Sequence, residues 1–165
     1  MSWVKIFRGD IGQEICIMME IREIRENKTA FMDLLLIGDE DEAMINRYLE
    51  PSTLFVLYDS EKPVSLCAVM KIDSDTIEIK NLATYPKYQN KGYASALLDF
   101  VYDKYKNECK ALILGTGENE KTLRFYKKRG FVEFDRVKNF FIDNYSHPIF
   151  EDGKQLTDMI YLKKI

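Results

Sequence analysis

Residues Tyr85–Leu98, YPKYQNKGYASALL, place a single glycine, Gly92, between a short polar turn and a run of good helix-forming residues. The stretch before it, TIEIKNLATY at positions 76–85, alternates polar and apolar residues as β-strands do. From Gly92 to Asn107, apolar residues recur at helical spacing. The sequence therefore predicts a strand, a polar turn and a helix that begins at the glycine.

The start of this helix is suited to an anion. The first N–H groups of a helix have no partner within it, and the aligned peptide dipoles make that end favourable for negative charge. Gly92 lets the backbone approach a phosphate closely, and Ala94 keeps the next turn small. Further donors come from the polar side chains of Gln89, Asn90, Lys91 and Ser95. Two interpretations remain at this point, a diphosphate-binding turn and an ordinary glycine-containing turn. The patterns of a P-loop and of a dinucleotide fingerprint are both missing.

The rest of the chain predicts further helices and strands. Helices are expected at 27–37, ending at Gly38, at 42–49, ending before Pro51, and at 119–129, closed by Gly130. Strands are expected at 20–24, 53–58, 64–72, 111–116, 131–143 and 156–162, and the second and third form an antiparallel hairpin around SEKP. This order predicts one mixed α/β domain over residues 19–165. Residues 1–18 form an N-terminal extension, either a strand or an arm.

Composition describes an ordinary globular domain. Of 165 residues, 46% are hydrophobic and 31% are charged. The net charge of −3 gives no basic footprint of the kind that phosphate backbones require, so nucleic acid is not expected as a partner. No run approaches the roughly 20 apolar residues of a membrane span, and a membrane is not expected as a partner either.

The cysteines suggest a reducing compartment. Cys16, Cys67 and Cys109 are odd in number and widely spaced, so they define no disulfide framework and no metal site. We expect buried, reduced thiols in a cytoplasmic protein.

Two stretches resemble one enzyme family. LATYPKYQNKGYASALL, from Leu82, resembles the acetyl-CoA signature of the GNAT N-acetyltransferases, whose pattern Q/R-x-x-G-x-G/A is met by Gln89, Gly92 and Ala94. NEKTLRFYKKRGF, from Asn119, resembles a later helix of that family, and the order of elements is similar from about Met19 to Leu162. The resemblance implies a single-domain GNAT-like fold, with a mixed, mostly antiparallel central sheet of about seven strands flanked by helices. It also implies acetyl-CoA as co-substrate and direct transfer of acetyl to a primary amine of a small molecule or peptide, through a ternary complex.

The same resemblance assigns roles to individual residues. The backbone of residues 82–84 would bind the pantetheine arm, the Leu82 amide would polarise the thioester carbonyl, and the turn 89–95 would bind the pyrophosphate. Asn119 would contact the pantetheine, and Tyr126 would act as general acid toward the departing thiolate. The implied cofactor-binding residues are Leu82, Ala83, Thr84, Gln89, Asn90, Lys91, Gly92, Tyr93, Ala94, Ser95, Asn119 and Tyr126.

Two of the catalytic assignments have structural alternatives. Tyr126 also fits a packed helix tyrosine in an apolar seam with Leu123 and Phe131. Glu78 is the candidate general base, at a position that resembles the catalytic glutamate of histone-type family members. Because Glu78 and Lys80 share one face of the strand, they also fit a solvated charge pair.

The acceptor side is the least family-like part of the sequence. His147, the single histidine, lies near Glu151 and Asp152, but this spacing matches no standard metal-ligand set, so no metal is expected. We interpret His147 as a surface-loop residue. In the GNAT fold the loop between the last two strands overhangs the acceptor, which makes Tyr145, His147 and Glu151 candidate substrate contacts.

Two further expectations concern activity and assembly. Family members often pair, and the aromatic residues of NFFIDNY at 139–145 are the candidate surface for a homodimer. The alternative to an enzyme is a non-catalytic acyl-CoA-binding regulatory domain of the same fold.

Overall fold

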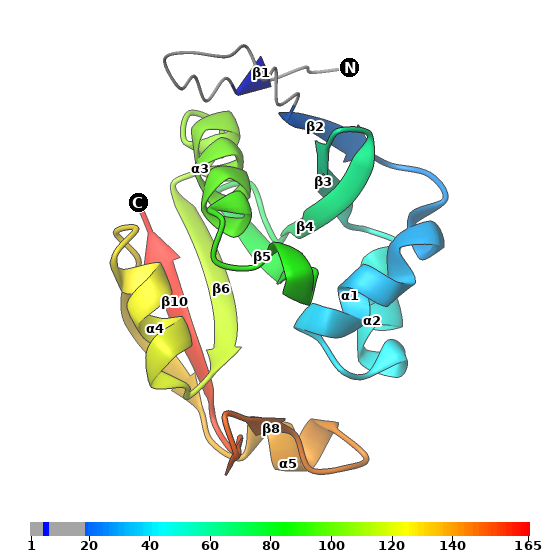
Figure 1. The fold of residues 1–165 in the computed structure, drawn as a ribbon. Helices are drawn as coiled ribbons and strands as arrows, with labels where there is room; N and C mark the ends of the chain where they lie inside the picture. The colour runs from blue at the N-terminus through cyan, green and yellow to red at the C-terminus, as the bar shows by residue number, and fades with distance from the viewer. Residues whose placement is uncertain (1–4, 7–18) are drawn as a thin grey trace. The chain divides into compact units, whose positions relative to one another are not determined.

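The computed structural model describes residues 5–6 and 19–165, and Figure 1 shows its strands and helices. The central sheet has eight strands in the order β1-β2-β3-β4-β5-β6-β10-β7. Strand β5 (Thr76–Thr84) is parallel to β6, and the other pairings described are antiparallel. This mixed, mostly antiparallel sheet with flanking helices confirms the predicted fold class. Most of the predicted extension 1–18 lies outside the described residues, and its boundary at residue 19 stays a prediction.

Chain contacts divide the protein into two compact units. The first contains residues up to Met70 together with Asn81–Asp103, and the second contains Lys71–Lys80 and Lys104–Ile165. Strand β5 therefore begins in the second unit and ends in the first.

The first unit carries helices on both faces of its strands. Its elements are β1 (Lys5–Ile6), β2 (Met19–Ile24), η1 (Lys28–Phe31), α1 (Met32–Gly38), α2 (Glu42–Leu49), β3 (Thr53–Asp59), β4 (Lys62–Lys71), the end of β5, η2 (Pro86–Tyr88) and α3 (Tyr93–Tyr105). Leu54 and Val56 of β3 share a buried cluster with residues of α1 and α2. Phe55, between them, packs edge-to-face on Phe100 of α3, with ring centroids 5.4 Å apart. Successive strand residues point to opposite faces, so the continuous apolar run of β3 is explained by helices on both sides.

The second unit contains the rest of the chain. Its elements are the start of β5, β6 (Ala111–Gly117), α4 (Glu120–Lys127), β7 (Val132–Val137), α5 (Phe140–Asn144), β8 (Phe150–Glu151), β9 (Lys154–Gln155) and β10 (Met159–Lys164). The ladder between β5 and β6 pairs Thr76–Ile79 with Ala111–Leu114. Phe141 of α5 forms a small apolar cluster with Ile149 and Leu156, which belong to the segment that links α5 to β10.

Several local predictions are confirmed. Helix α2 spans the predicted residues, α1 ends at Gly38, and α4 lies within the predicted helix 119–129. The structure adds that Asn119 is the N-cap of α4. Gly130 has φ +83°, the left-handed conformation expected after a helix.

The predicted strand 131–143 is wrong in its second half. Strand β7 ends at Val137, and helix α5 begins after Asn139, whose φ of 57° breaks the extended backbone. The Phe141 amide donates to the Thr157 carbonyl, and the Phe141 side chain is buried in the apolar cluster. The predicted strand 156–162 also begins later than expected, at Met159 of β10. Leu156 lies outside the strand because its amide donates to the Ile149 carbonyl and its side chain packs in the same cluster.

Burial refines two smaller predictions. Phe141 is only 8% exposed, whereas Phe140 and Tyr145 are partly exposed, so at most two of the three aromatic residues of 139–145 are open to a partner and the homodimer stays a prediction. Cys67 is buried as expected, whereas Cys109 is only partly buried, and Cys16 lies outside the described residues. None of the helices in the described part of the chain is long and apolar enough to cross a membrane.

Candidate active site

The turn before α3 has the backbone conformation that the sequence suggested. Asn90 and Gly92 have φ of 60° and 89°, in the left-handed region where glycine is favoured and asparagine is tolerated. The Ala96 amide donates to the Gly92 carbonyl at 3.0 Å, which marks the first turn of α3. The N–H groups that open a helix point out of its end, where the helix dipole attracts anions. The local geometry is therefore suited to a phosphate group.

Side chains of this turn are held by the first unit itself. Gln89 Nε2 donates to the Thr84 carbonyl at 3.1 Å, and the Tyr93 hydroxyl donates to the Asp59 carboxylate. The Lys91 ammonium lies 5.4 Å from the centre of the Tyr88 ring. These contacts fix the turn against β5 and the end of β3, so Gln89 and Tyr93 position the backbone in addition to any contact with a ligand.

The end of β5 leads directly into this turn. Ala83 and Thr84 are buried and Leu82 is partly exposed. These residues lie beyond the part of β5 that pairs with β6. The following residue, Tyr85, donates its hydroxyl to Asp33 of α1 at 2.5 Å, and burial, reinforced by Asp33, raises the pKa of Tyr85 to about 12. The predicted pantetheine-binding residues and the predicted pyrophosphate turn are thus consecutive parts of the first unit.

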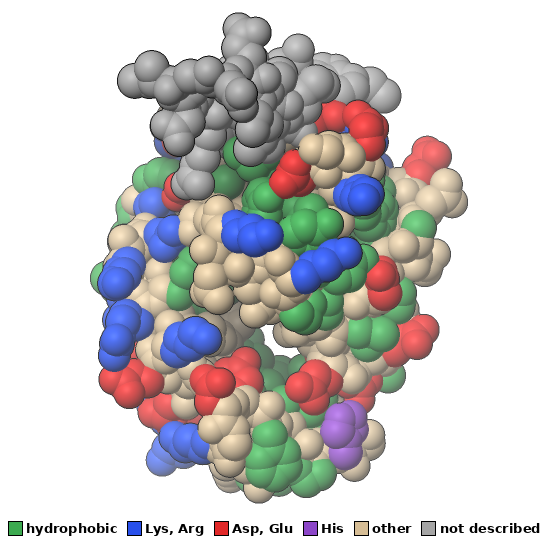
Figure 2. Space-filling view, viewed as in Figure 1, with side chains coloured by type: hydrophobic (Ala, Val, Ile, Leu, Met, Phe, Trp, Pro, Cys, Tyr) green, Lys and Arg blue, Asp and Glu red, His purple; other side chains and the backbone are tan. Residues whose placement is uncertain are grey.

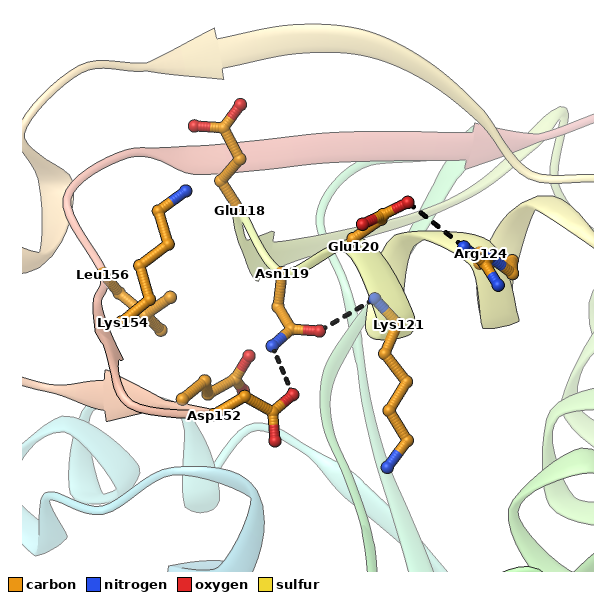
Figure 3. Close-up of a pocket in the computed structure, with 9 residues that line it drawn as sticks. Glu118, Asn119, Glu120, Lys121, Arg124, Asp152, Lys154 and Leu156 are labelled. Carbon is orange, nitrogen blue, oxygen red and sulfur yellow. Dashed lines mark hydrogen bonds and ion pairs between the residues drawn. The ribbon is translucent and has the colours of Figure 1, made fainter.

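In the second unit, Asn119 is the N-cap of α4. Its Oδ1 accepts from the amides of Lys121 and Thr122 at 2.9 and 3.1 Å. Its Nδ2 donates to Asp152 Oδ2 at 2.9 Å, which ties the turn between β8 and β9 to the start of α4 (Figure 3). The side chain therefore has a structural role, and its predicted contact with pantetheine stays a prediction.

Tyr126 lies on the buried side of α4. It is 8% exposed, and its ring packs edge-to-face on Phe125 and Phe131, with centroids 5.1 and 5.8 Å away. The contact with Phe131 agrees with the apolar seam that the alternative interpretation expected, and Phe125 takes part in place of Leu123. Packing restricts the side chain without excluding chemistry at its hydroxyl, so the role as general acid stays a prediction.

Glu78 is paired with Lys80. Lys80 Nζ lies 2.9 Å from Glu78 Oε1, and the Glu78 residue is 8% exposed. The expected charge pair is therefore present, but it is largely buried rather than solvated. Burial, with the nearby charge of Glu78 as a second cause, raises the pKa of Tyr161 on β10.

A cleft of about 450 Å³ lies at the start of α4 (Figure 3). It is lined by Glu118, Asn119, Glu120, Lys121, Arg124, Glu151, Asp152, Lys154 and Leu156. Arg136 hydrogen-bonds Glu118 at 2.7 Å and thereby holds the pKa of that carboxyl below its usual value. Glu120 is paired with Arg124 at 3.1 Å. Carboxylates and cations in this cleft are therefore closely balanced.

Of the three candidate substrate contacts, only Glu151 lines this cleft. Tyr145 stacks on Phe141, with ring centroids 5.5 Å apart, and is part of the small apolar cluster. His147 is exposed on the surface, as Figure 2 shows, and its Nδ1 lies 3.3 Å from the Ser146 hydroxyl. Within residues 19–165 there is no group of three or more His, Cys, Asp or Glu side chains arranged to hold a metal.

Sequence reasoning missed the polar residues that support the site. These residues are Asp152, Ser65 and Asn81. Ser65 carries a sequence signal, a polar residue in the otherwise apolar strand VSLCAV, whereas Asn81 lies in the alternating strand TIEIKNLATY and does not stand out. Such residues are hydrogen-bonded when buried, but the sequence does not name the partner.

Comparison with known proteins identifies similar chains. The sequence profile of the acetyltransferase (GNAT) family matches residues 20–131. The uncharacterized N-acetyltransferase YvbK of Bacillus subtilis is 30% identical over 139 residues, which cover 83% of this chain and 90% of YvbK.

Two similar solved structures contain bound acetyl-CoA or CoA. A GNAT family acetyltransferase from Elizabethkingia anophelis with acetyl-CoA bound is 37% identical, with a TM-score of 0.83 over 88% of this chain and 96% of that one. A Bacillus subtilis acetyltransferase in complex with CoA is 28% identical, with a TM-score of 0.79 over 88% and 97% of the two chains.

Proposed function

The chain belongs to the GNAT family of acetyltransferases, and from this premise we propose that it transfers acetyl from acetyl-CoA directly to a primary amine of a small molecule or peptide. Acetyl transfer in general follows from the family and from relatives with bound acetyl-CoA or CoA. The observation that carries the proposal is the left-handed backbone at Asn90 and Gly92, immediately before α3. Because this turn lies within the matched segment, we assign the pyrophosphate of acetyl-CoA to it.

Each step of the proposed acetyl transfer can be assigned to a residue of this chain. An aliphatic amine is protonated at neutral pH, so it must lose a proton before its nitrogen attacks the thioester carbonyl. Glu78, which lies 2.9 Å from Lys80 Nζ, is the candidate that takes this proton, directly or through water. The Leu82 amide donates to the carbonyl oxygen as negative charge develops there. When the C–S bond breaks, the CoA thiolate takes a proton from the Tyr126 hydroxyl. The new amide nitrogen gives up its remaining extra proton, which restores the Tyr126 hydroxyl, so the net proton released is the one that Glu78 removed from the ammonium group.

A second candidate is a non-catalytic acyl-CoA-binding domain. It is favoured by two observations, the packing of Tyr126 between phenylalanines and the ion pair of Glu78. The two candidates share the cofactor site and differ only in turnover. A cytoplasmic location belongs to either proposal and is supported by the free thiols of Cys67 and Cys109.

Release of CoA thiol from acetyl-CoA in the presence of a pooled amine library separates the two. Thiol release that depends on an amine, with a matching acetylated product by mass spectrometry, is the expected result. Tight acetyl-CoA binding with background thiol release across the pool would refute the enzyme and support the binding domain. In the active protein, Tyr126→Phe is expected to lower kcat about 10²-fold or more while leaving acetyl-CoA affinity unchanged.

The placement of the pyrophosphate has its own test. Gly92→Glu is expected to abolish acetyl-CoA binding measured by calorimetry, because it adds bulk and a negative charge where the diphosphate lies. Gly92→Gln has the same bulk and the same strain at positive φ without the charge, so it should bind more tightly than Gly92→Glu. Equal affinity of Gly92→Glu and the unmodified protein would refute the placement.

A further inference from the structure

Three of the buried polar residues lie around the end of β5. Ser65 of β4 is fully buried, and Asn81 and Thr84 of β5 are 4% and 8% exposed. A buried polar side chain is costly unless it is hydrogen-bonded, and an alanine would fill the position of Ser65 without that cost. Residues 82–84, which directly follow Asn81 and include Thr84, are the proposed pantetheine-binding backbone.

The bonds of Ser65 form a directed chain. Its hydroxyl donates to the Ala83 carbonyl at 2.7 Å, and its Oγ also lies 2.7 Å from Thr84 Oγ1. A serine hydroxyl has one proton, and that proton is used on the Ala83 carbonyl. The proton between the two hydroxyls therefore belongs to Thr84, and the chain runs from Thr84 through Ser65 to Ala83.

This chain acts on a single peptide group. The Ala83 carbonyl and the Thr84 amide belong to the same peptide unit, so a donor on that carbonyl fixes the plane of the unit and polarises its N–H. The Thr84 carbonyl is held separately by Gln89 Nε2 at 3.1 Å. Both carbonyls at this end of β5 are thus oriented by side chains, which leaves little freedom for the backbone that precedes the turn.

We propose that Ser65 is a positioning residue for acetyl-CoA, which acts with the Thr84 hydroxyl by holding the Ala83–Thr84 peptide in the orientation that binds the pantetheine arm. The inference rests on the proposed function, and it makes Ser65 part of the cofactor site without contact between its side chain and the cofactor. A purely structural serine would contribute to the stability of the fold, but its removal would lower acetyl-CoA affinity no more than removal of any other buried serine.

Ser52 provides a matched control. It is also buried, at 3% exposure, belongs to the same unit, and donates its hydroxyl to a backbone carbonyl, that of Tyr48, at 2.6 Å. Ser65→Ala and Ser52→Ala each remove one buried hydroxyl bonded to a backbone carbonyl, so their losses of thermal stability should be similar. Only Ser65→Ala should weaken acetyl-CoA binding, by about three- to tenfold, as expected for one lost hydrogen bond.

The experiment measures acetyl-CoA affinity by calorimetry and melting temperature for the unmodified full chain and each variant. Thr84→Val removes the second hydroxyl at nearly constant volume and should weaken affinity in the same direction, whereas Thr84→Ser keeps the hydroxyl and should restore most of it. The double variant Ser65→Ala/Thr84→Val should bind more tightly than the sum of the two effects predicts, with an affinity close to that of the weaker single variant, because one chain is broken in both.

The outcomes separate this inference from the proposed function. Unchanged affinity of Ser65→Ala, or an equal loss in Ser52→Ala, would overturn the positioning role while the unmodified protein still binds. Failure of the unmodified protein to bind acetyl-CoA would overturn the proposed function and the inference with it. A selective loss of acetyl-CoA affinity in Ser65→Ala, together with tighter binding by Thr84→Ser than by Thr84→Val, would support the positioning role and the cofactor site on which it rests.

Discussion

Replacement of Gly38 by alanine should disturb the protein through a residue far away in the sequence. A Cβ atom added at Gly38, the last residue of α1, would lie 2.3 Å from Asn81 Oδ1 and 2.9 Å from Asn81 Cγ. Both distances are well inside ordinary van der Waals contact, so the Asn81 carboxamide must move. That group is buried on β5, beside the proposed pantetheine-binding backbone.

The magnitude follows from the bonds that the movement breaks. Asn81 Nδ2 donates to the Leu35 carbonyl at 2.9 Å and to the Tyr48 hydroxyl at 3.0 Å. Each bond contributes about 1 kcal/mol net. The Leu35 carbonyl also accepts the Asp39 amide, so it is not left without a partner. Alanine in place of glycine at a helix end returns a few tenths of a kcal/mol at most. We therefore expect a loss of about 2 kcal/mol in the free energy of unfolding, or roughly 4–8 °C in Tm for a chain of this size.

Urea denaturation of four proteins tests this reasoning as a double-mutant cycle. The four are the unmodified chain, Gly38→Ala, Asn81→Ala and the double variant. Since Asn81→Ala removes the carboxamide that the new methyl meets, Gly38→Ala should cost less than about 0.5 kcal/mol in that background. Additive effects of the two changes, or a stable Gly38→Ala single variant, would refute the account of the contact.

Two further predictions concern the first unit. Lys28→Met should lower the free energy of unfolding by about 2 kcal/mol in urea denaturation, because the buried ammonium donates to the carbonyls of Leu49 and Glu50 at the end of α2; a change below about 0.5 kcal/mol would contradict this cap. Replacement of Ser60-Glu61 by Asn-Gly should raise Tm, with a gain of about 1 kcal/mol, since both residues of this two-residue hairpin turn have positive φ, 50° and 67°; an unchanged or lower Tm would show that the turn is not strained.

Much of the fold was accessible from local sequence patterns. The turn at Asn90–Gly92, the hairpin of β3 and β4, and helix α2 were all predicted where the structure has them. Each depends on residues within a few positions of one another: a glycine at positive φ, alternation along a strand, or a helix that ends before a proline.

The segment that follows β7 shows where local patterns fail. Residues 140–144 are rich in aromatic and β-branched side chains, which favour a strand, yet they form α5. Phe141 is held by the Thr157 carbonyl and by a cluster that includes Leu156, both more than ten residues away. Packing against residues distant in the sequence therefore outweighed the local preference of residues 140–144 for a β-strand.

The candidate site also has features that follow from local sequence and features that depend on long-range packing. The sequence by itself determined the anion-suited turn, the family signature and the approximate position of α4, because those features depend on backbone conformation and on near neighbours. Only the tertiary structure decided which buried polar groups meet: Ser65 with the Ala83 carbonyl, and Asn81 with Tyr48 beside Gly38. These partners come from different strands and helices, and a hydrogen bond between them forms only when packing brings donor and acceptor within about 3 Å.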